Sequence, residues 1–267
     1  MVKWIDSHCH YECGKFNKNR KEIIEKVSSC CEKVICVGTN IKENLGVIHL
    51  SEAYDFIYNM VGFFPTSVYV LDKAYCSDAD KNMAILREQL HHQKNVGLGE
   101  IGLDYSWNSC GDLKGDEARL LQQKWFREQI LIAKEYNKPI SIHSRDAEED
   151  TIKILNEFDS VEGVVHCFSY GVDAAKFFVD KGLYLGIGGT STYKNNQNIR
   201  DAIKITPIEK ILLETDAPYL SPEPVRRTVN DSSNITYVID LISQIKDISR
   251  KEIIDITNNN CQKLYKF

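Results

Sequence analysis

Six residues that can bind metal ions stand at the ends of short apolar runs in this chain of 267 residues. They are His8, His10, Glu100, His143, His166 and Asp216. Residues i and i+2 of a strand point to the same face, so one short strand can aim His8 and His10 at a single point. Imidazole and carboxylate groups bind zinc, manganese, iron or cobalt, and carboxylates also suit magnesium. The residue types therefore predict a metal-dependent hydrolase.

Each of these residues also has a plain structural interpretation when it is taken alone. A histidine at a strand end is often a polar rim residue, and Glu100 or Asp216 can cap the helix that follows. Their shared placement favours a metal site, in which a carboxylate such as Glu100 can bridge two ions. Two ions about 3.5–4 Å apart can activate a water and stabilise charge on a phosphoryl group. We therefore expect two divalent cations, with magnesium, manganese and zinc all compatible.

Short β-rich runs alternate with amphipathic helical stretches along the chain. The expected strands are Val2–His8, Lys33–Gly38, Phe56–Gly62, Val96–Ile101, Pro139–His143, Gly163–Cys167, Leu183–Gly188 and Lys210–Glu214. The expected helices are Asn19–Cys31, Lys42–Ala53, Asp80–His92, Arg119–Tyr136, Ala147–Asn156, Asp173–Lys181, Ile199–Ile205, Ile235–Ile245 and Ser249–Tyr265. Eight strands separated by helices predict a single-domain (β/α)8 TIM barrel over residues 1–267. A doubly wound open sheet is the alternative, and the strand count favours the barrel.

The barrel prediction places the candidate ligands on one rim. Each ends or follows an expected strand, and barrel enzymes keep their catalytic groups at that end. Two long segments follow the fourth and eighth strands, Tyr105–Glu117 with Trp107, and Ala217–Ser233. We expect both to be loops that shape the active site.

Composition excludes several classes of protein. The formal net charge of −5 argues against a broad basic surface for coating duplex DNA. No apolar run approaches the ~20 residues that a membrane span needs, and the N-terminus lacks the apolar stretch of a signal peptide. We therefore expect a cytoplasmic protein. Its nine cysteines are odd in number and irregularly spaced, which favours reduced thiols over disulfides.

Two motifs near the ligands have simpler explanations. The glycines of Gly97–Gly102 fit GxGxxG, but they lie within an expected strand and not in a turn that opens a helix. We interpret them as positions of close backbone approach. Cys9, Cys13 and Cys167 lie near the ligands and can bind a soft metal, but small buried thiols are the preferred interpretation.

The chain resembles the TatD family of metal-dependent deoxyribonucleases, a branch of the amidohydrolase-like barrels. The matching segments are Asp6–His10, Val61–Pro65, Gly99–Tyr105, Gln122 with Phe126–Gln129, Lys138–Arg145, Val165–Phe168 and Leu213–Leu220. The resemblance spans essentially the whole chain, and the combination of segments is highly specific.

The resemblance implies hydrolysis of phosphodiester bonds in DNA, from the 3′ side, with single strands or ends as the substrate. By family position, His8, His10, Glu100 and Asp216 hold one ion. Glu100, His143 and His166 hold the second. Glu100 and Asp216 are the catalytic carboxylates, and Asp216 orients or deprotonates the attacking water as general base.

Further residues are implied as substrate contacts or loop supports. Arg145 and Arg226 are candidates for phosphate contacts, because a guanidinium donates two hydrogen bonds to phosphate. A solvated loop charge is the alternative for Arg226. Many members have His where this chain has Phe64, which can stack on a base or simply pack in the rim. Asn230 and Asn234 match positions that order the last loop.

Two other functions stay open at this point. One is a metal-dependent hydrolase of a small amide, lactone or phosphoester. Many of those relatives bridge their ions through a modified lysine on the fourth strand, whereas Val96–Ile101 contains Glu100 and no lysine. The other is a non-catalytic scaffold, which the complete ligand set argues against. A monomer is plausible, and the sequence does not fix the native metal.

Overall fold

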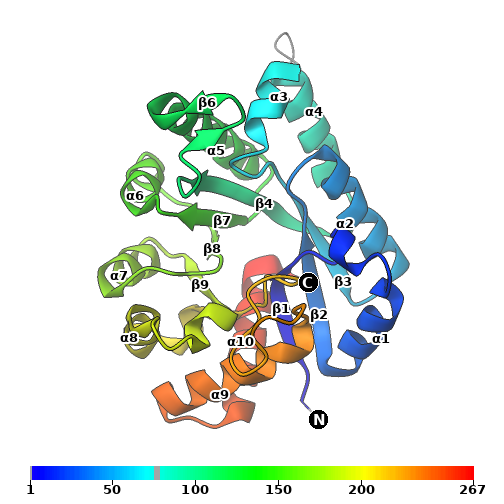
Figure 1. Ribbon diagram of the computed structural model, residues 1–267, viewed down its shortest axis with the longest axis vertical. Helices are drawn as coiled ribbons and strands as arrows, with labels where there is room; N and C mark the ends of the chain where they lie inside the picture. The colour runs from blue at the N-terminus through cyan, green and yellow to red at the C-terminus, as the bar shows by residue number, and fades with distance from the viewer. Residues whose placement is uncertain (1, 75–78) are drawn as a thin grey trace.

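A nearly closed barrel of parallel strands forms the centre of the molecule. The computed structural model describes residues 2–74 and 79–267. Within them, eight parallel strands pair in the order β1-β2-β3-β4-β7-β8-β9-β10 (Figure 1). They are β1 Trp4–Cys9, β2 Cys31–Val37, β3 Ile57–Val61, β4 Asn95–Asp104, β7 Ile140–Arg145, β8 Gly163–Val165, β9 Tyr184–Ile187 and β10 Ile211–Leu213.

Backbone hydrogen bonds between the ends of β1 and β10 close the sheet. The Asp216 amide donates to the His8 carbonyl oxygen at 2.9 Å, and the His10 amide donates to the Ala217 carbonyl oxygen at 2.7 Å. The prediction of a (β/α)8 barrel is confirmed, and the open-sheet alternative is wrong. The predicted strands are also confirmed, with ends that shift by at most three residues.

Helices surround the strands on the outside of the barrel (Figure 1). They are α1 Arg20–Cys30, α2 Ile41–Ala53, α3 Val68–Ala74, α4 Ala79–Leu90, α5 Gly115–Glu135, α6 Glu148–Asn156, α7 Val172–Asp180, α8 Gln197–Ile205, α9 Ile235–Lys246 and α10 Arg250–Tyr265. Short 3₁₀ turns occupy Gly14–Phe16, Gly189–Thr192, Ile208–Lys210 and Ser232–Asn234. Side chains cap some helices: the Asn40 side chain accepts from the backbone amides of Lys42 and Glu43.

The expectation of a loop over Tyr105–Glu117 is wrong for its second half. A hairpin of β5 (Ser109–Cys110) and β6 (Leu113–Lys114) folds there, turning through Gly111 at a φ of +62°. Helix α5 then begins at Gly115, four residues before the predicted Arg119. The acidic residues in its first turn stabilise the positive end of the helix dipole, so a stretch that reads as polar loop is helical.

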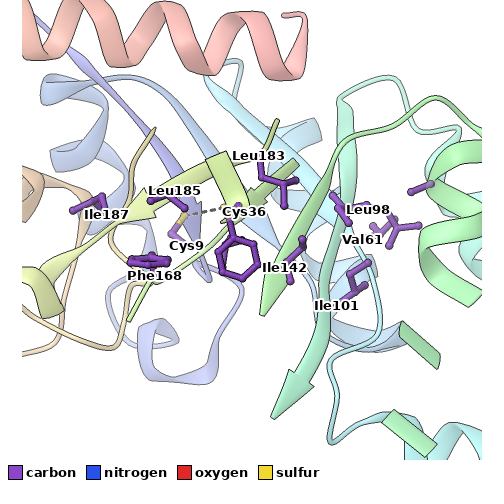
Figure 2. Close-up of a cluster of buried hydrophobic side chains, with 14 of the residues drawn as sticks. Cys9, Cys36, Val61, Leu98, Ile101, Ile142, Phe168, Leu183, Leu185 and Ile187 are labelled. Carbon is purple, nitrogen blue, oxygen red and sulfur yellow. Dashed lines mark hydrogen bonds between the residues drawn. The ribbon is translucent and has the colours of Figure 1, made fainter. Parts of the chain in front are cut away.

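Two hydrophobic clusters hold the barrel together. The larger cluster includes Cys9, Phe168 and Leu185 (Figure 2). The smaller cluster joins side chains from β1 to β4 with others from β8 and β10, on the far side of the sheet order, and with Leu264 and Tyr265 of α10. It therefore fills the barrel interior at the end closed by α10. Burying a large aliphatic side chain stabilises the fold by about 1.5–3 kcal/mol, so the rim opposite α10 can carry polar groups.

Two register shifts interrupt the barrel strands where the candidate ligands lie. One falls in β1 between Asp6 and Cys9, and the other in β4 between Leu98 and Ile101. Such irregularities re-aim side chains and are common next to active sites. The two shifts bracket His8 and Glu100.

Gly102 in β4 is a position where only glycine fits. Its φ is +137°, and an added Cβ would lie 2.0 Å from the His143 carbonyl oxygen. We expect Gly102→Ala to lower the free energy of unfolding by at least about 3 kcal/mol in urea denaturation. Gly182→Ala is the control, because its φ of +93° is unfavourable for alanine but its Cβ meets nothing within 4 Å. A loss of roughly 1–2 kcal/mol is expected there, and equal losses would contradict the steric explanation.

The described cysteines are free thiols, as predicted. Eight are unpaired, while Cys76 lies outside the described residues. The Sγ atoms of Cys9 and Cys36 are 3.7 Å apart in the larger cluster (Figure 2). Among residues 2–74 and 79–267, no helix combines the length and apolar character required to cross a membrane.

Candidate metal centre

The six candidate ligands converge at the carboxyl ends of the strands. His8 Nε2 lies 3.3 Å from His10 Nε2, and His143 Nδ1 lies 3.1 Å from His166 Nε2. The rings of His8 and His166 stack with centroids 3.9 Å apart. The histidines therefore form two pairs whose ring nitrogens face a common centre.

Glu100 lies between these two pairs. Its Oε1 is 2.7 Å from both His143 Nδ1 and His166 Nε2. Its Oε2 is 3.6 Å from both His8 Nε2 and His10 Nε2. Each carboxylate oxygen thus faces one histidine pair, which is the arrangement that a bridging ligand needs.

Asp216 lies at the mouth of the cluster. Its Oδ1 is 3.2 Å from His10 Nε2 and 4.0 Å from His8 Nε2. Its side chain is 16% exposed, whereas that of Glu100 is 4% exposed. The residue has a φ of +57°, and the hydrogen bond from its backbone amide to the His8 carbonyl oxygen holds this left-handed conformation. Asp216 therefore reaches both the histidines and solvent.

The donor set fits divalent metal ions. Among the described residues, two triplets have ligand atoms close enough to share an ion: His8 with Glu100 and His166, and His8 with His10 and Asp216. Nitrogen and carboxylate oxygen are the ligands of zinc, manganese and iron sites. Facing imidazole nitrogens without an ion or a proton between them would leave buried lone pairs unsatisfied.

The carboxylates change the protonation of the cluster. Burial opposes the charge of Glu100, but the charge of His166 and hydrogen bonds from His143 and His166 hold its pKa well below its usual range. Burial also opposes protonation of His143, yet Asp104 and Glu100 raise its pKa to about 9. His8 differs, because burial and the charge of His166 lower its pKa to about 4. An ion bound here would take the place of protons.

Comparison with known proteins identifies the family. A family model described as TatD related DNase matches residues 5–266. The chain belongs to the TatD family. It is 33% identical over 265 residues to an uncharacterized metal-dependent hydrolase, YabD, of Bacillus subtilis (strain 168), with 98% of each protein covered. It is 29% identical over 264 residues to YcfH of Escherichia coli (strain K12), also an uncharacterized metal-dependent hydrolase, covering 98% of this chain and 95% of the relative.

Solved TatD structures have the same fold. The structure of YjjV, a TatD homolog from Escherichia coli K12, matches with a TM-score of 0.86 at 29% identity, covering 99% of this chain and 98% of that one. A TatD family hydrolase from Entamoeba histolytica matches with a TM-score of 0.84 at 20% identity, covering 99% of each chain, and supports the fold alone. This TatD protein is therefore a metal-dependent hydrolase with a barrel fold.

Outward-facing partners fix the histidine rings of the TatD centre. His10 Nδ1 lies 2.7 Å from the Val37 carbonyl oxygen, and His143 Nε2 lies 3.2 Å from Asp104 Oδ2. Carbonyl and carboxylate oxygens only accept hydrogen bonds, so these ring nitrogens carry the protons. With an ion bound, the opposite nitrogens would turn their lone pairs toward it, beside Glu100 and Asp216, as metal ligation requires.

Asp104 and Glu214 are site residues that sequence reasoning did not single out. Asp104 Oδ1 also accepts from the amide and the hydroxyl of Ser106. Glu214 is fully buried, accepts from the Cys167 amide, and has its Oε1 3.8 Å from His166 Nδ1. Burial raises the pKa of Glu214 well above its usual range. The sequence signal for both residues was a carboxylate at the end of an apolar strand. The histidine that each one faces can be identified only from the three-dimensional structure.

Asp104 gives a direct test of ring positioning in the TatD centre. We expect Asp104→Ala to weaken manganese binding at the ion nearest His143 by about 10–100-fold in isothermal titration calorimetry. Ser106→Ala is the matched control, because it removes a partner of the other Asp104 oxygen and leaves His143 untouched. Equal manganese affinities in the two variants would show that Asp104 does not position His143.

The predicted substrate residues differ in their contacts and exposure. The half-buried Phe64 packs its ring against that of His143, with centroids 4.6 Å apart, so rim packing is present. Arg145 is exposed at the end of β7, and no described residue pairs with its guanidinium. Arg226 bonds to Glu223 at 3.2 Å and lies over the Tyr193 ring. Trp107 is 69% exposed.

Other sequence features have structural roles. The buried Asn230 donates to the Thr215 and Tyr219 carbonyl oxygens and accepts from Asn234, so both asparagines order the last loop. The glycines of Gly97–Gly102 lie inside β4, where a Cβ on Gly99 would lie 2.7 Å from Ser141 Cβ. They allow close strand approach, as predicted, and do not open a helix.

Proposed function

We propose that this TatD hydrolase cleaves phosphodiester bonds in DNA with two divalent ions, removing nucleotides from 3′ ends of single strands. The observation that carries the proposal is the position of Glu100 between two histidine pairs. One carboxylate shared by two ligand sets suits a pair of ions, and paired ions suit the displacement at phosphorus.

The proposed ligands follow the two halves of the cluster. His8, His10, Glu100 and Asp216 would hold one ion. Glu100, His143 and His166 would hold the other. A pair of divalent ions supplies a nucleophilic water at neutral pH and positive charge for the phosphoryl oxygens. Magnesium, manganese and zinc are all compatible with these donors.

Asp216 is the proposed general base. Its side chain is the more exposed of the two carboxylates that would bind ions, so it can reach a water outside the histidine pairs. Burial raises the pKa of Asp216, but the hydrogen bond and charge of His10 outweigh burial and keep it lowered. Asp216 is thus ionised and ready to orient the water and take its proton.

Three residues are proposed to bind the substrate. Arg145 is exposed on the rim, its guanidinium pairs with no residue that the structure describes, and it suits a phosphate contact. Arg226 is exposed on the loop after β10 and can reach the preceding phosphate. Phe64 covers one side of His143 and keeps part of its ring exposed, which suits stacking on the terminal base.

An end-labelled digestion tests the proposal. Manganese-loaded protein should shorten a 5′-labelled single-stranded oligodeoxynucleotide one nucleotide at a time, giving a ladder of products. An oligonucleotide labelled at its 3′ end should instead release the label as a mononucleotide in the first step. Absence of DNA hydrolysis with manganese, magnesium or zinc, together with turnover of a small amide or lactone, would contradict the proposal.

A further inference from the structure

Two cation–aromatic pairs lie in the segments that follow β1, β9 and β10 on the rim of the barrel. Lys15 Nζ lies 4.1 Å from the centre of the Tyr219 ring, and the Arg226 guanidinium lies 4.1 Å from the centre of the Tyr193 ring. Tyr219 and Arg226 belong to the loop after β10, which runs beside the end of β1 (Figure 1). Tyr193 follows β9, and Lys15 follows β1. We call these four residues the cation–tyrosine surface.

Hydrogen bonds hold this surface next to the metal centre. The Tyr219 amide donates to the Asp216 carbonyl oxygen at 2.9 Å, and the Tyr219 ring lies 6.4 Å from that of His10. The Tyr193 hydroxyl donates to the Ser221 carbonyl oxygen at 3.0 Å, which ties the loop after β9 to the loop after β10. The aromatic rings therefore have fixed positions relative to Asp216.

The opposite side of the rim carries mostly negative charge. A cleft of about 480 Å³ opens beside β7 and the start of α6. Asp146, Glu148, Glu149 and Asp150 line it, and Arg119 is its basic member. Exposed Lys194 and Arg227 instead add positive charge to the two loops of the cation–tyrosine surface, where Glu223 is bonded to Arg226. A polyanion is attracted to one side of the centre and repelled from the other.

We propose that the cation–tyrosine surface binds the single strand upstream of the cleaved bond, so that the chain enters past β9, β10 and β1 and not past β7. The proposal rests on the proposed deoxyribonuclease function and adds the path of the substrate. Lys15 and Arg226 contact consecutive phosphates, and Tyr219 and Tyr193 stack on unpaired bases.

The chemistry of the surface favours a single strand over other anions. Binding of single strands combines a positive groove for the backbone with aromatic rings for the bases, and stacking tolerates every sequence. Bases inside a duplex are already stacked and cannot lie on a tyrosine. A chain of phosphates without bases would contact only the two cations and not the tyrosine rings. The tyrosines therefore distinguish an oligonucleotide from a plain polyanion.

Binding without hydrolysis tests the proposal. The probe is a fluorescein-labelled twelve-nucleotide oligo(dT), and its anisotropy is measured with EDTA present. We expect the double variant Lys15→Ala/Arg226→Ala to bind at least about tenfold more weakly. Its affinity should also depend less on salt, by roughly 0.7 in the logarithmic slope for each lost phosphate contact. The control is Lys251→Ala/Lys263→Ala, which removes the same charge from α10 at the opposite end of the barrel.

Two further readouts separate the outcomes. Tyr219→Leu should weaken oligo(dT) binding about tenfold or more, since base stacking is lost, while leaving the affinity for inorganic polyphosphate unchanged. Manganese-dependent hydrolysis of bis(p-nitrophenyl) phosphate, which is too small to reach the surface, is measured for the wild type and for the Lys251→Ala/Lys263→Ala control and should be the same in both. Unchanged oligo(dT) affinity in the Lys15/Arg226 and Tyr219 variants would overturn the inference. Turnover of the small diester by the wild type would still support the proposed function in that case. A wild-type protein that hydrolyses neither diester would instead overturn the proposed function.

Discussion

Glu100→Gln is expected to lower kcat for DNA hydrolysis by at least about 10³-fold, which corresponds to roughly 4 kcal/mol of transition-state stabilisation. Glutamine keeps the size of the side chain but removes the negative charge that faces both histidine pairs. The variant should also bind at most one manganese ion, whereas we expect two for the wild type. Single-turnover digestion and metal analysis of the dialysed protein measure the two effects.

Comparison with Asp104→Ala makes the Glu100 prediction sharper. Asp104 touches His143 from outside the cluster, so excess manganese should restore most of the activity of Asp104→Ala. Excess manganese should not restore Glu100→Gln, because the shared ligand itself is lost. Recovery of Glu100→Gln to within tenfold of wild type at saturating manganese would show that Glu100 is not the bridge.

Asp216→Asn is expected to lower kcat by about 10²–10⁴-fold at saturating manganese, the range for loss of a general base. The amide oxygen can still face His10, so we expect both ions to remain bound and KM for the oligonucleotide to change little. Rate measurements at several manganese concentrations distinguish loss of the base from loss of the ion.

Asp146→Asn is the matched control for Asp216→Asn. Asp146 also follows a barrel strand on the same rim and also has a positive φ, of 52°, but it faces the acidic cleft. Its replacement should leave kcat within a few fold of wild type. Similar losses in both variants would mean that the effect comes from rim charge and not from proton transfer at Asp216.

The barrel could be predicted because its signal is repeated along the chain. Apolar runs such as Val34–Val37 are buried on both faces, and glycines or polar residues mark their ends. The seven-residue α3 and the two-residue strands β5 and β6 were missed. Elements this short carry too few residues for a period to appear, and contacts such as that between Tyr69 and Asp112 stabilise them.

The candidate ligands could be found from the sequence because they interrupt apolar runs at one end of the strands. Their pairing could not. Register shifts occur around His8 and Glu100, and a shift of one residue moves a side chain to the other face of the strand. The alternating pattern of the sequence does not reveal such shifts. The same limit applies to Asp104, whose partner His143 is far away in the chain. That these residues bind ions remains a prediction.

The position of bound metal tests the shared role of Glu100 most directly. The measurement is an anomalous difference map, at the manganese edge, from a crystal soaked in manganese. Two peaks about 3.5–4 Å apart are expected, one beside His8, His10 and Asp216 and the other beside His143 and His166, with Glu100 contacting both. A single peak at full occupancy, or two peaks that do not share Glu100, would contradict the two-ion centre.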